Sequence, residues 1–189
     1  MPNVTEWMMA IAIGIGLAAA TGFRVFLPLL VAGAAAHWGA LPLADGFQWL
    51  SSTPTLMALG TASIVEVTAY YIPGVDHLLD VLAAPTAMAA GIIATASVMV
   101  DVPPAIMWPV AIIVGGGTAA ATKVTSAVVR AKSSLLTAGL ANPIVSTAET
   151  LGSIVIAALA VVVPIASLIV LAVWLLVARR RRRRVLAKT

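Results

Sequence analysis

Apolar residues in this chain gather into five long blocks separated by short breaks. Most blocks approach or exceed the length of about 20 apolar residues that crosses the hydrocarbon core of a bilayer as a helix. The breaks carry proline, glycine and aspartate, which end helices and form turns. The pattern therefore predicts an all-α fold, a polytopic bundle of transmembrane helices. The blocks cover residues 7–36, 55–72, 81–100, 106–129 and 144–177.

The last block decides how many spans there are. As one helix, residues 144–177 would rise about 50 Å, against a hydrocarbon core of about 30 Å. Pro164 lies inside the block, where a proline either kinks one long span or separates two short ones. The count is then five or six. Six fits better, because only six spans keep Arg130 and Lys132 on the same side as the arginine-rich C-terminus.

Six spans place both termini and the loop after Arg130 in the cytoplasm. The first residues include Glu6 but no Lys or Arg, so the first block is interpreted as a retained membrane helix and not as a secretory signal. We expect a single transmembrane domain over residues 1–178, followed by a basic cytoplasmic tail at 179–189.

A faint internal similarity divides the domain into two candidate halves, residues 7–100 and 105–178. GIGLAAAT in the first half resembles GGGTAAAT in the second, and SIVE resembles STAE, in the same order. Because three spans per half is an odd number, the halves would be inverted three-helix repeats, a plan common in transporters. Small residues recur in any membrane helix, so chance similarity is the alternative.

Composition agrees with a membrane protein and removes other classes. Of the 189 residues, 61% are hydrophobic and 10% charged, whereas a soluble domain is about a quarter charged. Cysteine is absent, so neither disulfides nor thiol chemistry are expected.

The net charge of +4 comes from six consecutive arginines, and removing them leaves −2. With no basic patch elsewhere, nucleic-acid binding is not expected. The run is interpreted as a membrane-surface anchor that attracts anionic lipids. It consists of Arg179, Arg180, Arg181, Arg182, Arg183 and Arg184.

Charged residues inside the apolar blocks are costly unless paired or wetted, and they usually mark function. Counted from the nearest cytoplasmic end, Glu66, Lys123 and Glu149 all lie about 10 Å deep on the same side. We expect Lys123 to pair with one of the glutamates in a cavity open to the cytoplasm. Ser126 and Arg130 follow at spacings of three and four, so this polar stripe should face the bundle interior. The alternatives are a structural ion pair or side chains that extend to the interface.

Arg24 lies well inside the first block, between Gly22 and Pro28. This arrangement predicts a broken helix, and unwound backbone at membrane depth is tolerated only against protein or a wet cavity. An arginine there can bind a carboxylate or phosphate through two parallel hydrogen bonds. The alternative is that the span ends near Arg24, which then anchors it at the interface.

The stretch IPGVDHLLD predicts a turn at Pro73 and Gly74, followed by a helix with Asp76 as N-cap and Asp80 in its first turn. Asp76, His77 and Asp80 could instead bind a cation or relay protons. A metal site is not expected, because the only other histidine is far away in the sequence.

The start of the last block has two interpretations. Asn142 as N-cap with Pro143 at the first helical position would begin the helix early. A helix beginning near Ser146 would instead make Glu149 the partner of a capping box, close to the interface.

Five stretches together resemble the domain-of-unknown-function 4126 family of small bacterial integral membrane proteins. They are TGFRVFLP, EVTAYYIPGVDHLLD, APTAMAAG, GGGTAAATKVTSAVVRAKSS and GLANPIVSTAE, and they occur in the family's order over about residues 10–160. The resemblance implies a protein of the bacterial cytoplasmic (inner) membrane, and it implies no reaction or substrate. The family often has a second acid after the last glutamate; here that position is Thr150, which leaves a two-carboxylate site in doubt. The positions that match the family's motifs are Arg24, Glu66, Pro73, Gly74, Asp76, Asn142, Pro143, Ser146 and Glu149.

The leading interpretation is a transporter-like or channel-like permease for a small anionic solute or ion. Arg24, Lys123 and Arg130 would attract the anionic group, while Glu66 and Glu149 would titrate or pair. The alternative is a non-catalytic accessory or scaffold subunit of a larger membrane complex, in which the same charges hold helices together.

An enzyme is not expected, because no catalytic triad, metal-ligand cluster or dinucleotide-binding loop stands out. No cofactor is expected either. The expected partners are the lipid bilayer and either further copies of the chain or a larger membrane complex.

Overall fold

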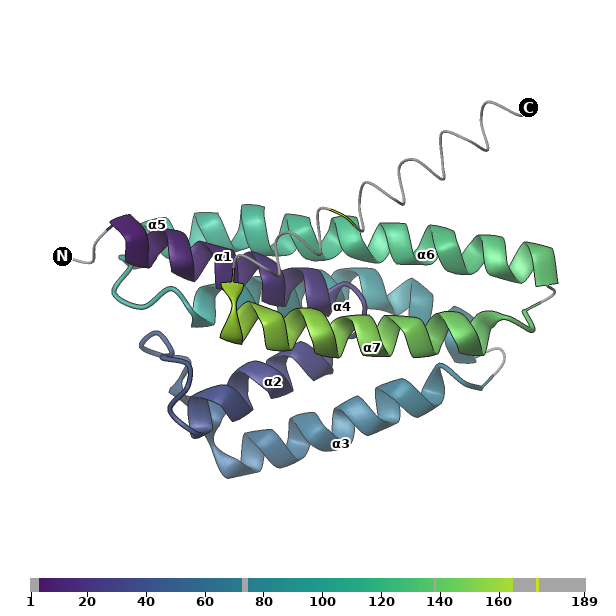
Figure 1. Cartoon of the computed structure of the whole chain (residues 1–189), viewed down its shortest axis with the longest axis horizontal. Coiled ribbons are helices and arrows are strands. Elements are labelled where there is room, and N and C mark those ends of the chain that lie inside the picture. The colour runs from purple at the N-terminus through teal and green to yellow at the C-terminus, as the bar shows by residue number, and fades with distance from the viewer. Residues whose placement is uncertain (1–3, 73–74, 138, 165–172, 174–189) are drawn as a thin grey trace.

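The computed structural model describes residues 4–72, 75–137, 139–164 and 173. Within them every regular element is helical, which confirms the all-α prediction (Figure 1). In chain order the elements are α1 (Val4–Thr21), α2 (Phe26–His37), the short helix η1 (Gln48–Ser51), α3 (Thr53–Ala69), α4 (Val75–Ser97), α5 (Pro104–Val110), η2 (Ala111–Gly116), α6 (Gly117–Thr137) and α7 (Asn142–Val162).

Two helical stretches among these residues are long and apolar enough to cross a membrane, Pro104–Thr137 and Asn142–Val162. The helices lie lengthwise beside one another, and α1 packs against α4, α6 and α7 at the centre of the bundle (Figure 1). The core is built largely from alanine and leucine, and the small alanine side chains let helices approach closely.

The first apolar block forms a helical hairpin and not one broken span. α1 ends and α2 begins on either side of Arg24, as the sequence predicted, but the chain also reverses there. One cavity shows the reversal, because Glu6 and Met9 near the start of α1 line it together with Leu41 and Pro42, which follow α2. α2 thus returns toward the end of the bundle where α1 began (Figure 1).

This reversal changes which loops share an end of the bundle. The loop after α2 meets the end of α4, where the Ala44 N–H donates to the Ser97 carbonyl over 2.8 Å. At the opposite end, the Tyr71 hydroxyl bonds the Thr147 hydroxyl over 2.7 Å. The start of α1 and the α6–α7 turn therefore lie at opposite ends (Figure 1). The prediction that the N-terminus and the loop after Arg130 share one side is wrong, because the hairpin adds a reversal that the block length concealed.

Close packing at α4 explains several of the glycines. A Cβ added at Gly14 of α1 would lie 2.8 Å from Thr95 Cγ2, and one added at Gly115 of η2 would lie 2.4 Å from Thr95 Oγ1. Both backbones therefore approach the same threonine of α4. Gly115 lies in the π-helical stretch η2, which joins α5 to α6, and π-helical turns inside longer helices often accompany functional sites.

The two halves are not inverted copies. Gly14 and Gly115 meet at Thr95, and Gly22 lies against Thr122, so α1 and α6 run in the same direction. In contrast, α3 and α7 run in opposite directions, because the end of α3 contacts the start of α7 (Figure 1). One inversion cannot relate both pairs, and the predicted inverted repeat is therefore wrong.

The last apolar block is not one continuous helix. α7 ends at Val162, two residues before Pro164, as expected of a proline that stops a helix. The remainder of the block and the basic tail at 179–189, with its six arginines, lie outside the described residues. Six spans therefore stay a prediction.

Candidate functional site

Arg24 lies in the break between α1 and α2 with no exposed surface. Its guanidinium bonds α7 from two sides. Nε donates to the Thr150 hydroxyl over 2.9 Å. Nη2 donates to the carbonyl and the hydroxyl of Ser146 over 2.9 and 2.6 Å. Nη1 is buried and makes no hydrogen bond within the described residues. The break between α1 and α2 thus presents a buried cation to α7. The alternative that Arg24 anchors the span at the membrane interface is wrong, because the residue has no exposed surface.

Glu66 of α3 serves as the cap of a different helix. Its two carboxylate oxygens accept from the backbone N–H groups of Val25 and Phe26, over 2.8 and 3.2 Å. These peptide groups begin α2, whose N-terminus carries the positive end of the helix dipole. Val25 itself provides no side-chain cap, so the carboxylate from α3 occupies the place of a capping residue.

Glu149 of α7 is held by side chains. Arg130 and Ser126, both from α6, donate to its two carboxylate oxygens. Arg24 Nη2 lies 3.8 Å from Glu149 Oε2. Two guanidinium groups therefore share one buried carboxylate, and the ion pair joins α6 to α7.

Tyr70, the residue that follows α3, lies at the centre of these charges and is 3% exposed. The guanidinium carbons of Arg24 and Arg130 lie 4.2 and 4.7 Å from the centre of its ring. Lys123 Nζ lies 5.4 Å from the same centre and donates to the hydroxyl over 3.2 Å. Such contacts stabilise cations through the ring's electron-rich face.

The sequence analysis missed Tyr70. The available signal was its position four residues after Glu66, which puts both on one helix face. In the structure Lys123 donates to the tyrosine hydroxyl and Arg130 binds Glu149, and the pairing of Lys123 with a glutamate stays a prediction. Arg130 lies about two turns further along α6 than Lys123. We call Arg24, Glu66, Tyr70, Lys123, Arg130 and Glu149 the charged cluster.

The start of α7 follows the earlier of its two interpretations. The helix begins at Asn142, with Pro143 in its first turn, and Ala141 as the residue before it. The Asn142 side chain bonds Ser134 of α6 over 3.0 Å and does not cap α7. Glu149 is therefore two turns inside α7, so the capping box beginning at Ser146 is wrong.

The predicted turn before α4 is largely outside the described part of the chain. Pro73 and Gly74 fall in a gap, and the side chains of Asp76, His77 and Asp80 are not described. α4 begins at Val75. Among the described residues, no group of three or more His, Asp or Glu side chains could hold a metal ion.

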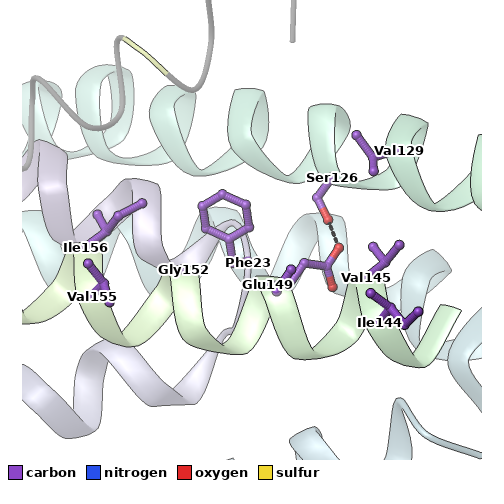
Figure 2. A pocket seen from close by; sticks show the side chains of 10 residues that line it. Phe23, Ser126, Val129, Ile144, Val145, Glu149, Gly152, Val155 and Ile156 are labelled. Atoms are coloured by element: carbon purple, nitrogen blue, oxygen red, sulfur yellow. Dashed lines mark hydrogen bonds between the residues drawn. The ribbon is translucent and has the colours of Figure 1, made fainter. Parts of the chain in front are cut away.

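Two apolar grooves flank the charged cluster. One lies between α6 and α7, with a volume of about 410 Å³, and its polar lining is Ser126 and Glu149 (Figure 2). Its walls are aliphatic, apart from the ring of Phe23 (Figure 2). The other lies between α3 and α4, with about 280 Å³, and reaches Glu66 and Tyr70. We call the first of these the α6–α7 groove.

Comparison with known proteins gives the family and nothing finer. No curated protein and no solved structure matches the chain. The sequence profile described as "Domain of unknown function (DUF4126)" matches residues 11–184, which is most of the chain. The charged cluster, from Arg24 to Glu149, lies entirely within the matched range. The chain therefore belongs to the DUF4126 family.

Proposed function

We propose that this chain is an integral membrane protein of transporter type that binds a small anionic group at the charged cluster. The observation that carries the proposal is Arg24, a fully buried cation at a helix break whose Nη1 has no hydrogen-bond partner in the described residues. A buried donor without a partner costs about 1–3 kcal/mol. An anionic oxygen beside Nη1 would remove that cost.

A bilayer is the solvent that suits the outer surface. Large aliphatic side chains face outward along the helices, for example Ile113 at 73% exposure and Leu151 at 58%. Charged side chains are gathered inside instead, as expected when a bundle hides them from lipid. The N-terminus of α2 also begins inside the bundle beside Arg24, and helix N-termini at membrane depth point at anionic substrate groups in transporters.

The ends of the bundle differ in charge, and this suggests an orientation. Glu6 and Asp101 line one cavity at the end that holds the start of α1, and Asp45 follows Ala44, which bonds Ser97 at that end. Arg130 and Lys132 lie in the last turns of α6, at the other end. Because Lys and Arg collect on the cytoplasmic side, the α6–α7 turn is cytoplasmic and the start of α1 faces outward. Single cysteines at Ser134 and Asp45 test this, since the chain has no other cysteine. Labelling of both from one side of the membrane would reject it.

An accessory or scaffold subunit is the second candidate. The observation in its favour is that Arg130 and Ser126 bind both oxygens of the Glu149 carboxylate and so join α6 to α7. A purely structural lock needs no ligand. The two candidates therefore differ in whether an added anion stabilises the protein.

Thermal unfolding of the purified chain in detergent, with and without phosphate, chloride or acetate, separates the candidates. We expect one of these anions to raise the Tm of the wild type, because ligands stabilise the state that binds them. Thr150→Glu places a carboxylate beside Arg24 Nε, which now bonds the threonine hydroxyl. This variant should lose the response to the anion.

Thr150→Val is the matched control, because it removes the same hydroxyl without adding charge. It should keep the response. If no anion raises the Tm of the wild type, or if Thr150→Glu responds as the wild type does, the anion site is wrong and the scaffold role is favoured.

A further inference from the structure

The α6–α7 groove combines two chemistries that a small soluble ion would not need. Its walls are aliphatic, and the residues that supply them from α7 include Ile144, Val145 and Val155. Its polar end consists of Ser126 and Glu149, which belong to or contact the charged cluster (Figure 2). A volume of about 410 Å³ lies in the range of roughly 300–1,000 Å³ typical of sites for organic ligands.

We propose that the groove admits the hydrocarbon tail of an amphiphilic anion from the bilayer, while its phosphate or carboxylate head binds beside the charged cluster. This inference rests on the proposed function and names its substrate class. The tail replaces water or lipid along the aliphatic walls, which is favourable in proportion to the apolar area covered. The head lies at the groove's polar end.

Charge complementarity selects an anion over a cation. Glu149 lines the groove's polar end, and Arg24 and Arg130 both lie against its carboxylate. Ser126 adds a hydroxyl to the lining, and Arg24, next to Glu149, has in Nη1 a donor with no partner in the described residues. An anionic head can take up these donors, whereas a cationic head would have to displace two guanidinium groups from Glu149.

The first test places a fluorophore in the groove. Val155 lines it and Leu151 does not, although both are half-exposed apolar residues of α7. Each is replaced in a separate variant by cysteine, which is then the only cysteine of the chain, and is labelled with bimane. Each labelled full-length chain is reconstituted in phosphatidylcholine vesicles. The probe is dodecyl phosphate brominated at the end of its tail, because bromine quenches bimane on contact. A dodecyl trimethylammonium with the same brominated tail is the control for charge.

We expect the phosphate probe to quench the label at Val155 more strongly than the label at Leu151, and the trimethylammonium probe to quench both alike. Equal quenching of both labels by the phosphate probe would overturn the inference, since lipid-facing residues meet any dissolved tail. The inference would also be overturned if neither probe quenched the label at Val155, because another part of the chain would then fill the groove.

A second test blocks the groove. Gly152 lines it, and an added Cβ there meets nothing within 4 Å, as is also true of Gly60 on α3, outside the groove. We expect Gly152→Leu to bind dodecyl phosphate about tenfold more weakly. A tenfold loss corresponds to roughly two methylene groups of the tail that can no longer be buried in the groove. Gly60→Leu should bind as the wild type does.

The response of the Tm to inorganic phosphate separates the two proposals. If phosphate stabilises the wild type and Gly152→Leu alike, while dodecyl phosphate binds both equally, the anion site stands and the amphiphile is wrong. If no anion stabilises the wild type, both proposals fail. Weaker dodecyl phosphate binding by Gly152→Leu, with the phosphate response kept, is the supporting outcome.

Discussion

The two buried glutamates occupy similar sequence contexts but are stabilised by different means. Glu66, in SIVE, accepts from the peptide N–H groups that begin α2. Glu149, in STAE, accepts from the side chains of Arg130 and Ser126. Both are almost fully buried. One carboxylate is therefore fixed by backbone, and the other depends on side chains that can rearrange.

The difference separates a structural role from a functional one within the same cluster. Peptide groups at a helix start cannot leave without unwinding α2, so Glu66 holds the helix break in place. A side-chain ion pair can exchange one partner for another by rotation. Glu149 is therefore the carboxylate that a bound anion could displace from its arginines, and it is also the one that lines the α6–α7 groove.

Removing the charge of Glu149 should have the largest effect on stability. Glu149→Gln leaves the buried guanidinium groups of Arg24 and Arg130 without their shared carboxylate. Breaking a buried ion pair on one side costs about 3–5 kcal/mol. We expect a clearly lower midpoint of denaturant unfolding, measured on the full chain in detergent. A loss no larger than that of Glu66→Gln would contradict the comparison.

Glu66→Gln should be milder. The amide oxygen can still accept from one of the two peptide N–H groups of Val25 and Phe26, and only the second is left without its acceptor. We expect a loss of about 1–3 kcal/mol, the cost of one unsatisfied buried group. Glu66→Ala, which removes both acceptors, is the reference for complete loss of the cap. If Glu66→Gln unfolds as readily as Glu66→Ala, the backbone contacts do not account for its role.

The residues of the charged cluster could be predicted from the sequence better than the path of the chain that brings them together. Charges inside apolar blocks are conspicuous, so Arg24, Glu66 and Glu149 could be identified singly. Counting residues from helix ends could also place Glu66 and Glu149 at similar depth. The reversal after α1 could not be predicted, because a block of thirty apolar residues has the same composition whether it crosses once or folds back. The binding of Glu149 by Arg130 could not be predicted for a related reason, since depth does not specify which of two cations reaches a carboxylate.

A double-mutant cycle on Arg130 and Glu149 should measure the side-chain ion pair directly. The double variant Arg130→Gln with Glu149→Gln should lose less than the two single changes added together. Neighbouring charged residues couple by about 0.5–3 kcal/mol. The matched cycle on Lys123→Met with Glu149→Gln should be close to additive, because the Glu149 carboxylate is bound by Arg130 while Lys123 donates to the Tyr70 hydroxyl. Strong coupling of Lys123 and weak coupling of Arg130 would reverse the assignment.

Tyr70→Phe should have the smallest effect, and it divides the tyrosine's two contributions. The substitution removes the hydroxyl that accepts from Lys123 over 3.2 Å and keeps the ring beneath the two arginines. A typical intramolecular hydrogen bond contributes about 0.5–1.5 kcal/mol, so we expect a loss in that range.

Tyr70→Leu also removes the ring face that the guanidinium groups of Arg24 and Arg130 contact. It should lose more, because cation–π contacts contribute roughly 2 kcal/mol when desolvated. Denaturant unfolding of both variants gives the difference. If Tyr70→Phe and Tyr70→Leu are equally destabilised, the ring does not hold the arginines. Their approach to Glu149 would then depend on the carboxylate alone, and the side-chain half of the comparison would rest on a single ion pair.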